Sequence, residues 1–179
     1  KKFIIKRSGA KVGDSIWVTG NIGESHLGLL IKKNKIKVNK KINSYYLKKY
    51  SSPKPCMLGS KILNYLNSGI DISDGFLGDL HKLLDSKLGV NLIYSKIPFS
   101  KNTKYLIKKK KIDPFLLLNG GDDYELIFTC SEKYDYKIKA IAKTNKYKVS
   151  KVGHIIHGKE ILLDGKKINN TRKSFQYLF

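Results

Sequence analysis

The chain has 179 residues, of which 41% are hydrophobic, and this composition suits one domain with a sizeable core and excludes disorder over most of its length. The formal net charge of +22 suggests a polyanion as partner, but it comes almost entirely from scattered lysines, with arginine only at Arg7 and Arg172. Because tight phosphate and base recognition favours arginine, a solvated lysine surface is favoured over a nucleic-acid-binding face.

Hydrophobic periodicity predicts the elements in chain order. The first half reads as a strand over residues 15–19, helices over residues 23–31, 43–50 and 57–66, a strand over residues 70–72, a helix over residues 76–88 and a strand over residues 90–94. The second half reads as an exposed helix over residues 101–111, an apolar run at residues 116–118, a strand over residues 125–130, a helix over residues 134–144 and a hairpin of residues 147–157 and 160–163. This irregular alternation predicts an α+β domain with helices packed on a mixed β-sheet.

The cysteines and histidines give little sign of a disulfide or metal framework. Cys56 and Cys130 lie far apart without a CxxC pair, which is typical of reduced thiols in a cytoplasmic protein. His154 and His157 fall in the predicted hairpin without a third ligand, so a metal site is not favoured there. No apolar stretch approaches the roughly 18 residues of a bilayer-spanning helix, and no secretory signal opens the chain.

Acidic residues are few but clustered. The chain has only 14 of them, and two short stretches, residues 69–75 (GIDISDG) and residues 120–125 (GGDDYE), carry a large share. In the first stretch, Asp71 and Asp74 flank a predicted strand-to-helix turn, where two carboxylates can converge on Mg2+. The N–H groups that open the following helix favour anions. The alternative is that Ser73 or Asp74 caps this helix, and both roles are compatible.

The second stretch combines a Gly-Gly turn with Asp122 and Asp123, just before a predicted buried strand. Glycine lets a ligand approach the backbone closely, although aspartates also serve ordinary turns. Arg7, retained in a chain that otherwise uses lysine, suggests a phosphate contact, with a plain surface cation as the alternative. No GxxxxGKS or GxxxxGKT segment is present, which argues against a Walker-type ATPase. His26 and His81 fall in predicted helices and are expected at the surface or in the core.

Three segments together resemble thiamine-monophosphate kinases: KRSGAKVGDSIWVTGNIGESHLGLLI, SGIDISDGFLGDL and NGGDDYELIFT, in this order and spacing. The resemblance covers nearly the whole chain. It implies a layered α/β/α domain with a mixed β-sheet, similar to the carboxy-terminal domain of aminoimidazole ribonucleotide synthetase. It further implies that residues 1–179 are the carboxy-terminal domain of a two-domain enzyme. Residues 1–13 would lead in from an amino-terminal domain that is missing from this sequence.

The resemblance also implies an activity and a site. The activity is ATP-dependent phosphorylation of thiamine monophosphate to thiamine diphosphate, by direct Mg2+-assisted in-line transfer. By motif position, Asp71 and Asp74 would hold Mg2+, and Arg7 and Ser73 would contact ATP. The thiamine substrate would be contacted by Asp122, where the family more often has Glu, and by Phe175.

The same resemblance implies a cytoplasmic homodimer, joined through the missing amino-terminal domain, and no activity for residues 1–179 on their own. Two alternatives stay open at this point. One is a sibling ATP-dependent synthetase of the same superfamily, which the DYEL continuation and the RSGAKVGD opening disfavour. The other is a non-catalytic basic domain that binds nucleic acid, which the clustered acids disfavour.

Overall fold

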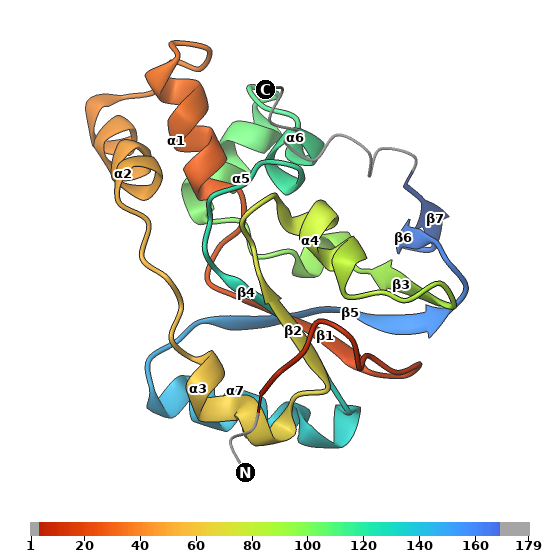
Figure 1. The fold of residues 1–179 in the computed structure, drawn as a ribbon. Helices are drawn as coiled ribbons and strands as arrows, with labels where there is room; N and C mark the ends of the chain where they lie inside the picture. Colours follow the sequence, from red (N-terminus) through yellow and green to blue (C-terminus); the bar gives the residue numbers. More distant parts are fainter. Residues whose placement is uncertain (1–3, 169–179) are drawn as a thin grey trace, which may run out of the picture.

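The computed structural model describes residues 4–168, which form a seven-stranded mixed sheet with helices on both faces (Figure 1). The strand order is β2-β4-β1-β5-β3-β6-β7, and every pair is antiparallel except β3 with β6. The strands are β1 (Ser15–Thr19), β2 (Ser68–Asp71), β3 (Leu88–Leu92), β4 (Leu126–Cys130), β5 (Val149–His157), β6 (Ile161–Leu163) and β7 (Lys166–Lys167).

Helices cover the two faces of the sheet unequally. Figure 1 shows α1, α2, α4, α5 and α6 on one side and α3 and α7 on the other, so the predicted layered α/β/α architecture is confirmed. The helices are α1 (Glu24–Lys32), α2 (Lys40–Ser51), α3 (Gly59–Ile62), α4 (Phe76–Lys82), α5 (Lys101–Lys108), α6 (Pro114–Leu118) and α7 (Asp135–Thr144). Short 3-10 turns lie at Leu63–Tyr65, Tyr94–Lys96 and Glu132–Tyr134.

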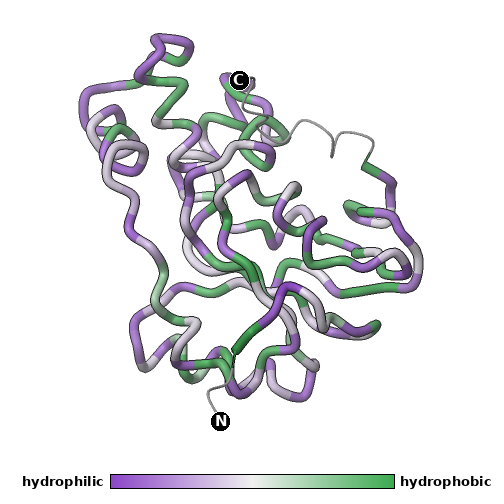
Figure 2. Tube along the Cα trace, viewed as in Figure 1, coloured by the Kyte–Doolittle hydropathy of each residue, from purple (hydrophilic) through white to green (hydrophobic). Residues whose placement is uncertain are grey.

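The core has two parts because β1 is buried on both faces. Ile16 and Val18 belong to the large cluster under α1 and α4, whereas Trp17 packs with Phe128 in a smaller cluster against α3 and α7. Alternate side chains of a strand point to opposite faces, so one five-residue strand serves both layers. Figure 2 shows the apolar strands in the middle of the molecule and polar segments around it. The predicted core position of Trp17 is confirmed, at 1% exposure.

The predicted hairpin of residues 147–157 and 160–163 is wrong. The strand β3 lies between these segments, pairing with β5 on one side and in parallel with β6 on the other. The hairpin in this region is instead β6–β7, closed by Asp164 and Gly165 with φ of 50° and 77°. An Asp-Gly turn with two positive φ values has the twist that a tight hairpin requires.

Several other predicted segments also differ from the structure. The helix predicted over residues 76–88 ends at Lys82, because Leu88 begins β3. The helix predicted over residues 57–66 is reduced to α3 and a 3-10 turn. Residues 116–118 belong to the short helix α6, which starts with Pro114 and is capped by the Asp113 carboxylate, 2.9 Å from the Phe115 N–H.

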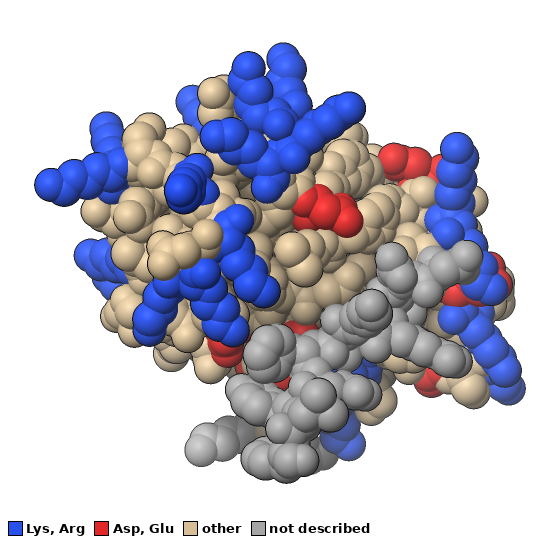
Figure 3. Space-filling model, turned by 90° about the horizontal axis from the view of Figure 1, so that it is seen from above, with Lys and Arg blue, Asp and Glu red and all other residues tan. Residues whose placement is uncertain are grey.

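Lysines dominate the outer surface. Figure 3 shows the molecule of Figure 1 from above. Lys and Arg side chains project over much of this face, with Asp and Glu between them. The lysines are spread over this face, as their scattered positions in the sequence predict. Within residues 4–168, no helix has the length and apolar character needed to cross a membrane.

Candidate functional site

Two acidic stretches far apart in the sequence lie side by side at one end of the sheet. The pairing of β2 with β4 places Asp71 opposite Leu126, and backbone hydrogen bonds continue beyond the strands. The Ile72 N–H donates to the backbone carbonyl oxygen of Glu125 at 2.7 Å, and the Asp122 N–H donates to that of Ser73 at 2.9 Å. Residues 71–75 and 120–125 therefore form one hydrogen-bonded unit, which we call the acidic edge.

Glycines allow the two halves of the acidic edge to come this close. A Cβ atom at Gly121 would lie 2.2 Å from the Ser73 carbonyl oxygen, and one at Gly75 would lie 2.6 Å from that of Asn119. Gly75 also has a φ of 114°, which side chains rarely adopt. Because the colliding atoms are backbone, neither contact can be relieved by a side-chain rotation.

The substitution Gly121→Ala is expected to separate the two halves of the acidic edge and to destabilise the fold by about 1–3 kcal/mol. Denaturant unfolding of the purified protein measures this loss. Gly59→Ala is the matched control, since a Cβ there meets only the Leu126 side chain, at 3.2 Å. Equal stability of Gly121→Ala and the wild type would contradict the close packing.

Asp79 holds the first half of the acidic edge in place. Its fully buried carboxylate accepts hydrogen bonds from the Ser73 N–H at 2.9 Å and the Asp74 N–H at 2.8 Å. The predicted capping of this helix by Ser73 or Asp74 is wrong, because the N-cap of α4 is Gly75 and it has no side-chain cap. Lys82 pairs with Asp79 at 2.7 Å and also with Asp74, so its ammonium offsets both carboxylates.

The structure brings most of the sequence-predicted residues to this region. Asp71 is exposed at the end of β2, while Ser73, Asp74 and Asp122 are half-buried around one small cavity. Arg7 borders a neighbouring hollow of about 460 Å3 that Lys82 also lines. Phe175 lies outside the described residues.

Two residues of α1, which the sequence did not single out, also belong to this site. Ser25 and His26 line the same small cavity as Asp122. Within residues 4–168, Ser25 Oγ and His26 Nε2 are buried and have no hydrogen-bond partner, which points to a bound polar group. Burial lowers the pKa of His26, although Asp122 raises it, so the imidazole is neutral near pH 7. The only sequence signal was a histidine just after the Gly-rich opening of a helix.

Asp123 joins the second half of the acidic edge to α1. Its carboxylate accepts hydrogen bonds from the Gly23 N–H at 2.6 Å and the Ser25 N–H at 3.0 Å, where α1 has no side-chain cap of its own. A cap from residues about 100 positions away in the sequence fixes the end of α1 against the site. Burial raises the pKa of Asp123 to about 7, against the lowering effect of the two N–H donors.

The donor set suits Mg2+ in part. Mg2+ is commonly held by one or two carboxylates, with substrate phosphates and water completing the shell. Asp71 ends β2, and Asp74 lies three residues further along the chain, where it pairs with Lys82. Within residues 4–168, no group of three or more acidic, histidine or cysteine side chains is placed to hold a metal alone. His154 and His157 are three positions apart in β5 and so project to opposite faces.

The family described as "AIR synthase related protein, C-terminal domain" matches residues 11–165. The thiamine-monophosphate kinase of Buchnera aphidicola subsp. Acyrthosiphon pisum (strain APS) is 39% identical over 185 residues, covering 99% of this chain and 56% of that relative. The thiamine-monophosphate kinase of Escherichia coli (strain K12) is 38% identical over 131 residues, covering 72% of this chain and 40% of its own length. The chain therefore spans about half the length of the curated relatives that it matches.

Solved structures share the fold. The thiamine-monophosphate kinase of Stenotrophomonas maltophilia K279a superposes with a TM-score of 0.82 at 24% identity, covering 93% of this chain and 55% of that one. A structure described as AaThiL complexed with AMPPCP and TMP superposes with a TM-score of 0.77 at 26% identity, covering 92% and 52%. The mixed sheet with two helical layers is therefore an arrangement that these proteins have in common.

Proposed function

Since the chain belongs to the AIR synthase related protein family and matches its C-terminal domain, we propose that it is the carboxy-terminal half of a thiamine-monophosphate kinase. The reaction is ATP-dependent phosphorylation of thiamine monophosphate to thiamine diphosphate. One observation carries this proposal: the acidic edge joins the two acidic motifs that resemble this enzyme family through direct backbone hydrogen bonds. Residues 1–13 then lead in from an amino-terminal domain, through which the enzyme forms a homodimer in the cytoplasm.

Each residue of the site has a proposed role. Asp71 and Asp74 hold Mg2+, which offsets the negative charge of the phosphate groups. Ser73 and Arg7 bind ATP. The support for Arg7 is the hollow that it lines with Lys82, a second cation, which pairs with Asp74. Asp122 and Phe175 contact the thiamine substrate. For Asp122, the support is the cavity that it lines with the partnerless polar atoms of Ser25 and His26.

In this reaction, these residues position two anionic reactants and offset their negative charge. No covalent nucleophile takes part, since the terminal phosphoryl group of ATP passes directly to the phosphate of thiamine monophosphate. Lys82, held by the fixed carboxylate of Asp79, keeps a positive charge next to the proposed phosphate path. His26 stays neutral and can donate or accept one hydrogen bond at Nε2, so it can orient a bound polar group without adding charge.

The test is a direct assay of the intact protein with ATP, Mg2+ and thiamine monophosphate. Thiamine diphosphate is followed by its fluorescence after oxidation, and product is expected with thiamine monophosphate but not with unphosphorylated thiamine, which serves as the control acceptor. A folded intact protein that forms no thiamine diphosphate would reject the proposal. The sibling-synthetase alternative would then take precedence.

A further inference from the structure

We propose that a second anion-binding site lies beside β5, and that it takes a small molecule carrying two or more phosphate groups. The site is an open cavity of about 590 Å3, within the size range of small-molecule sites. We call it the lysine cavity, and its lining residues are Trp17, Ile93, Ser95, Lys96, Ile97, Pro98, Phe99, Lys104, Lys139, Lys148, Val149, Ser150 and Lys151. It shares no lining residue with the acidic edge or with the hollow next to Arg7.

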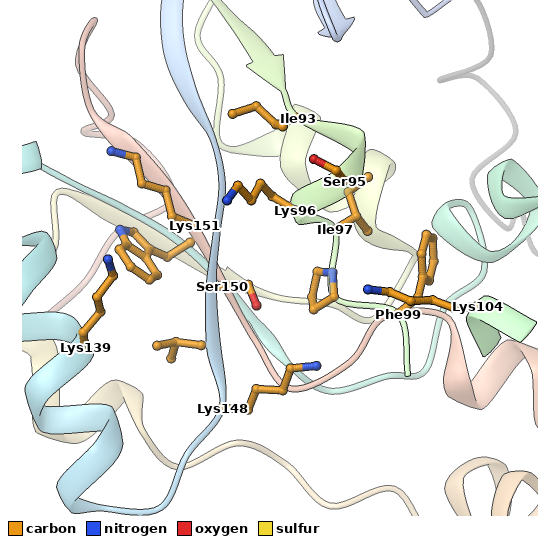
Figure 4. Close-up of a pocket in the computed structure, with 13 residues that line it drawn as sticks. Ile93, Ser95, Lys96, Ile97, Phe99, Lys104, Lys139, Lys148, Ser150 and Lys151 are labelled. Carbon is orange, nitrogen blue, oxygen red and sulfur yellow. The ribbon is translucent and has the colours of Figure 1, made fainter. Parts of the chain in front are cut away.

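The charge of the lysine cavity comes from several elements that fold around one space. Figure 4 shows Lys96 after β3, Lys104 on α5, Lys139 on α7, and Lys148 and Lys151 on or next to β5. The ends of Lys104 and Lys148 extend toward one another across the cavity (Figure 4). A cavity with ammonium groups on several walls suits an anion with charge at more than one point, such as a condensed phosphate.

Most of this charge has no carboxylate partner. Lys151 is neutralised, since its Nζ lies 2.8 Å from carboxylate oxygens of both Glu132 and Asp135. Lys148 donates to the neutral amide oxygen of Asn21. Among the ion pairs of residues 4–168, none includes Lys96, Lys104, Lys139 or Lys148.

The cations also affect one another. Burial lowers the pKa of Lys148, the charges of Glu24 and Glu125 raise it, and the charge of nearby Lys104 lowers it. Like charges held near each other disfavour their own charged forms, so a bound anion would relieve the repulsion between Lys104 and Lys148. An anion with two or more charges can offset several of these ammonium groups at once.

The apolar part of the lining gives room for an organic group. Ile93 is 37% exposed, and Pro98 also lines the cavity. Cations together with an apolar surface suit a phosphate ester better than an inorganic ion alone.

Isothermal titration of the intact protein with inorganic tripolyphosphate tests the phosphate part of the proposal. The cavity variant carries Lys96→Gln, Lys104→Gln and Lys148→Gln. The matched control carries Lys108→Gln, Lys143→Gln and Lys159→Gln, three exposed lysines outside the cavity, so both variants lose the same charge. We expect the cavity variant to bind about tenfold more weakly or worse, because charge-assisted hydrogen bonds are lost, and the control to bind as the wild type does.

Two outcomes would overturn the proposal. Equal weakening in both triple variants would assign binding to the overall positive field of the protein. Unchanged binding in the cavity variant would assign the tripolyphosphate to another site, such as the hollow between Arg7 and Lys82. Thermal unfolding of both variants checks that they are folded. Substitutions of exposed lysines are expected to leave the unfolding temperature unchanged.

Discussion

Replacing Asp71 or Asp74 by asparagine is expected to lower the turnover number of the intact enzyme by a factor of about 100 or more, with the fold unchanged. Asparagine keeps the shape of aspartate but removes the charge that would hold Mg2+ and offset the phosphates. Asp71 is exposed, so its charge has little part in folding. Asp74 shares Lys82 with Asp79, which keeps its own contact at 2.7 Å when Asp74 is changed.

The measurement is a steady-state assay of thiamine diphosphate formation across a range of Mg2+ concentrations. The charge-removing control is Asp164→Asn, an exposed carboxylate in the β6–β7 turn that accepts a hydrogen bond from the Tyr94 N–H at 3.1 Å. It should keep wild-type turnover. Near-normal turnover in both Asp71→Asn and Asp74→Asn would remove the metal assignment from this end of β2.

Replacing Asp123 by alanine is expected to destabilise the fold by about 3 kcal/mol, through a lost helix cap and two buried N–H groups without a partner. The Gly23 and Ser25 N–H groups have Asp123 as their acceptor, at 2.6 and 3.0 Å. Denaturant unfolding measures the loss, with Asp164→Asn again as the control. A change below about 0.5 kcal/mol, the usual range for surface positions, would contradict the capping role.

The same residue makes stability depend on pH. Burial raises the pKa of Asp123 from its ordinary value of 3.8 to about 7, so between these values the folded state binds this proton more tightly than the unfolded state does. The favourable contribution is complete below the ordinary pKa and is lost as pH rises through about 7, with a slope of up to about 1.4 kcal/mol per pH unit. Asp123→Asn should remove this slope, which unfolding free energies at pH 5, 6, 7 and 8 will test. Parallel curves for variant and wild type would contradict it.

The sequence predicted those elements whose side chains carry their own signal. The strand at residues 15–19 agrees with β1, and the strand and helix predicted over residues 125–130 and 134–144 agree with β4 and α7 to within one residue. Short apolar runs in the strands and a regular apolar face in the helix do not depend on distant residues. The position of β6 does depend on distant residues. The strand β3, from much earlier in the sequence, pairs with both β5 and β6 and so lies between them.

The candidate site was predictable to a similar extent. Clustered aspartates in a lysine-rich chain pointed to the acidic edge, and the family resemblance assigned the roles. The support from Asp79, the cap by Asp123 and the place of His26 all depend on contacts across turns or between distant segments. No local pattern shows such contacts, because a buried aspartate looks the same in the sequence as an exposed one.

The position of β1 in the middle of the sheet has a consequence for synthesis on the ribosome. Both neighbours of this strand come much later in the sequence, since β4 begins at Leu126 and β5 at Val149. At typical elongation rates, the apolar segment Ser15–Thr19 emerges on the order of 10 s before either neighbour exists. During that interval it is a ready binding segment for a chaperone, and nascent chains that stop before residue 126 cannot complete the sheet around it.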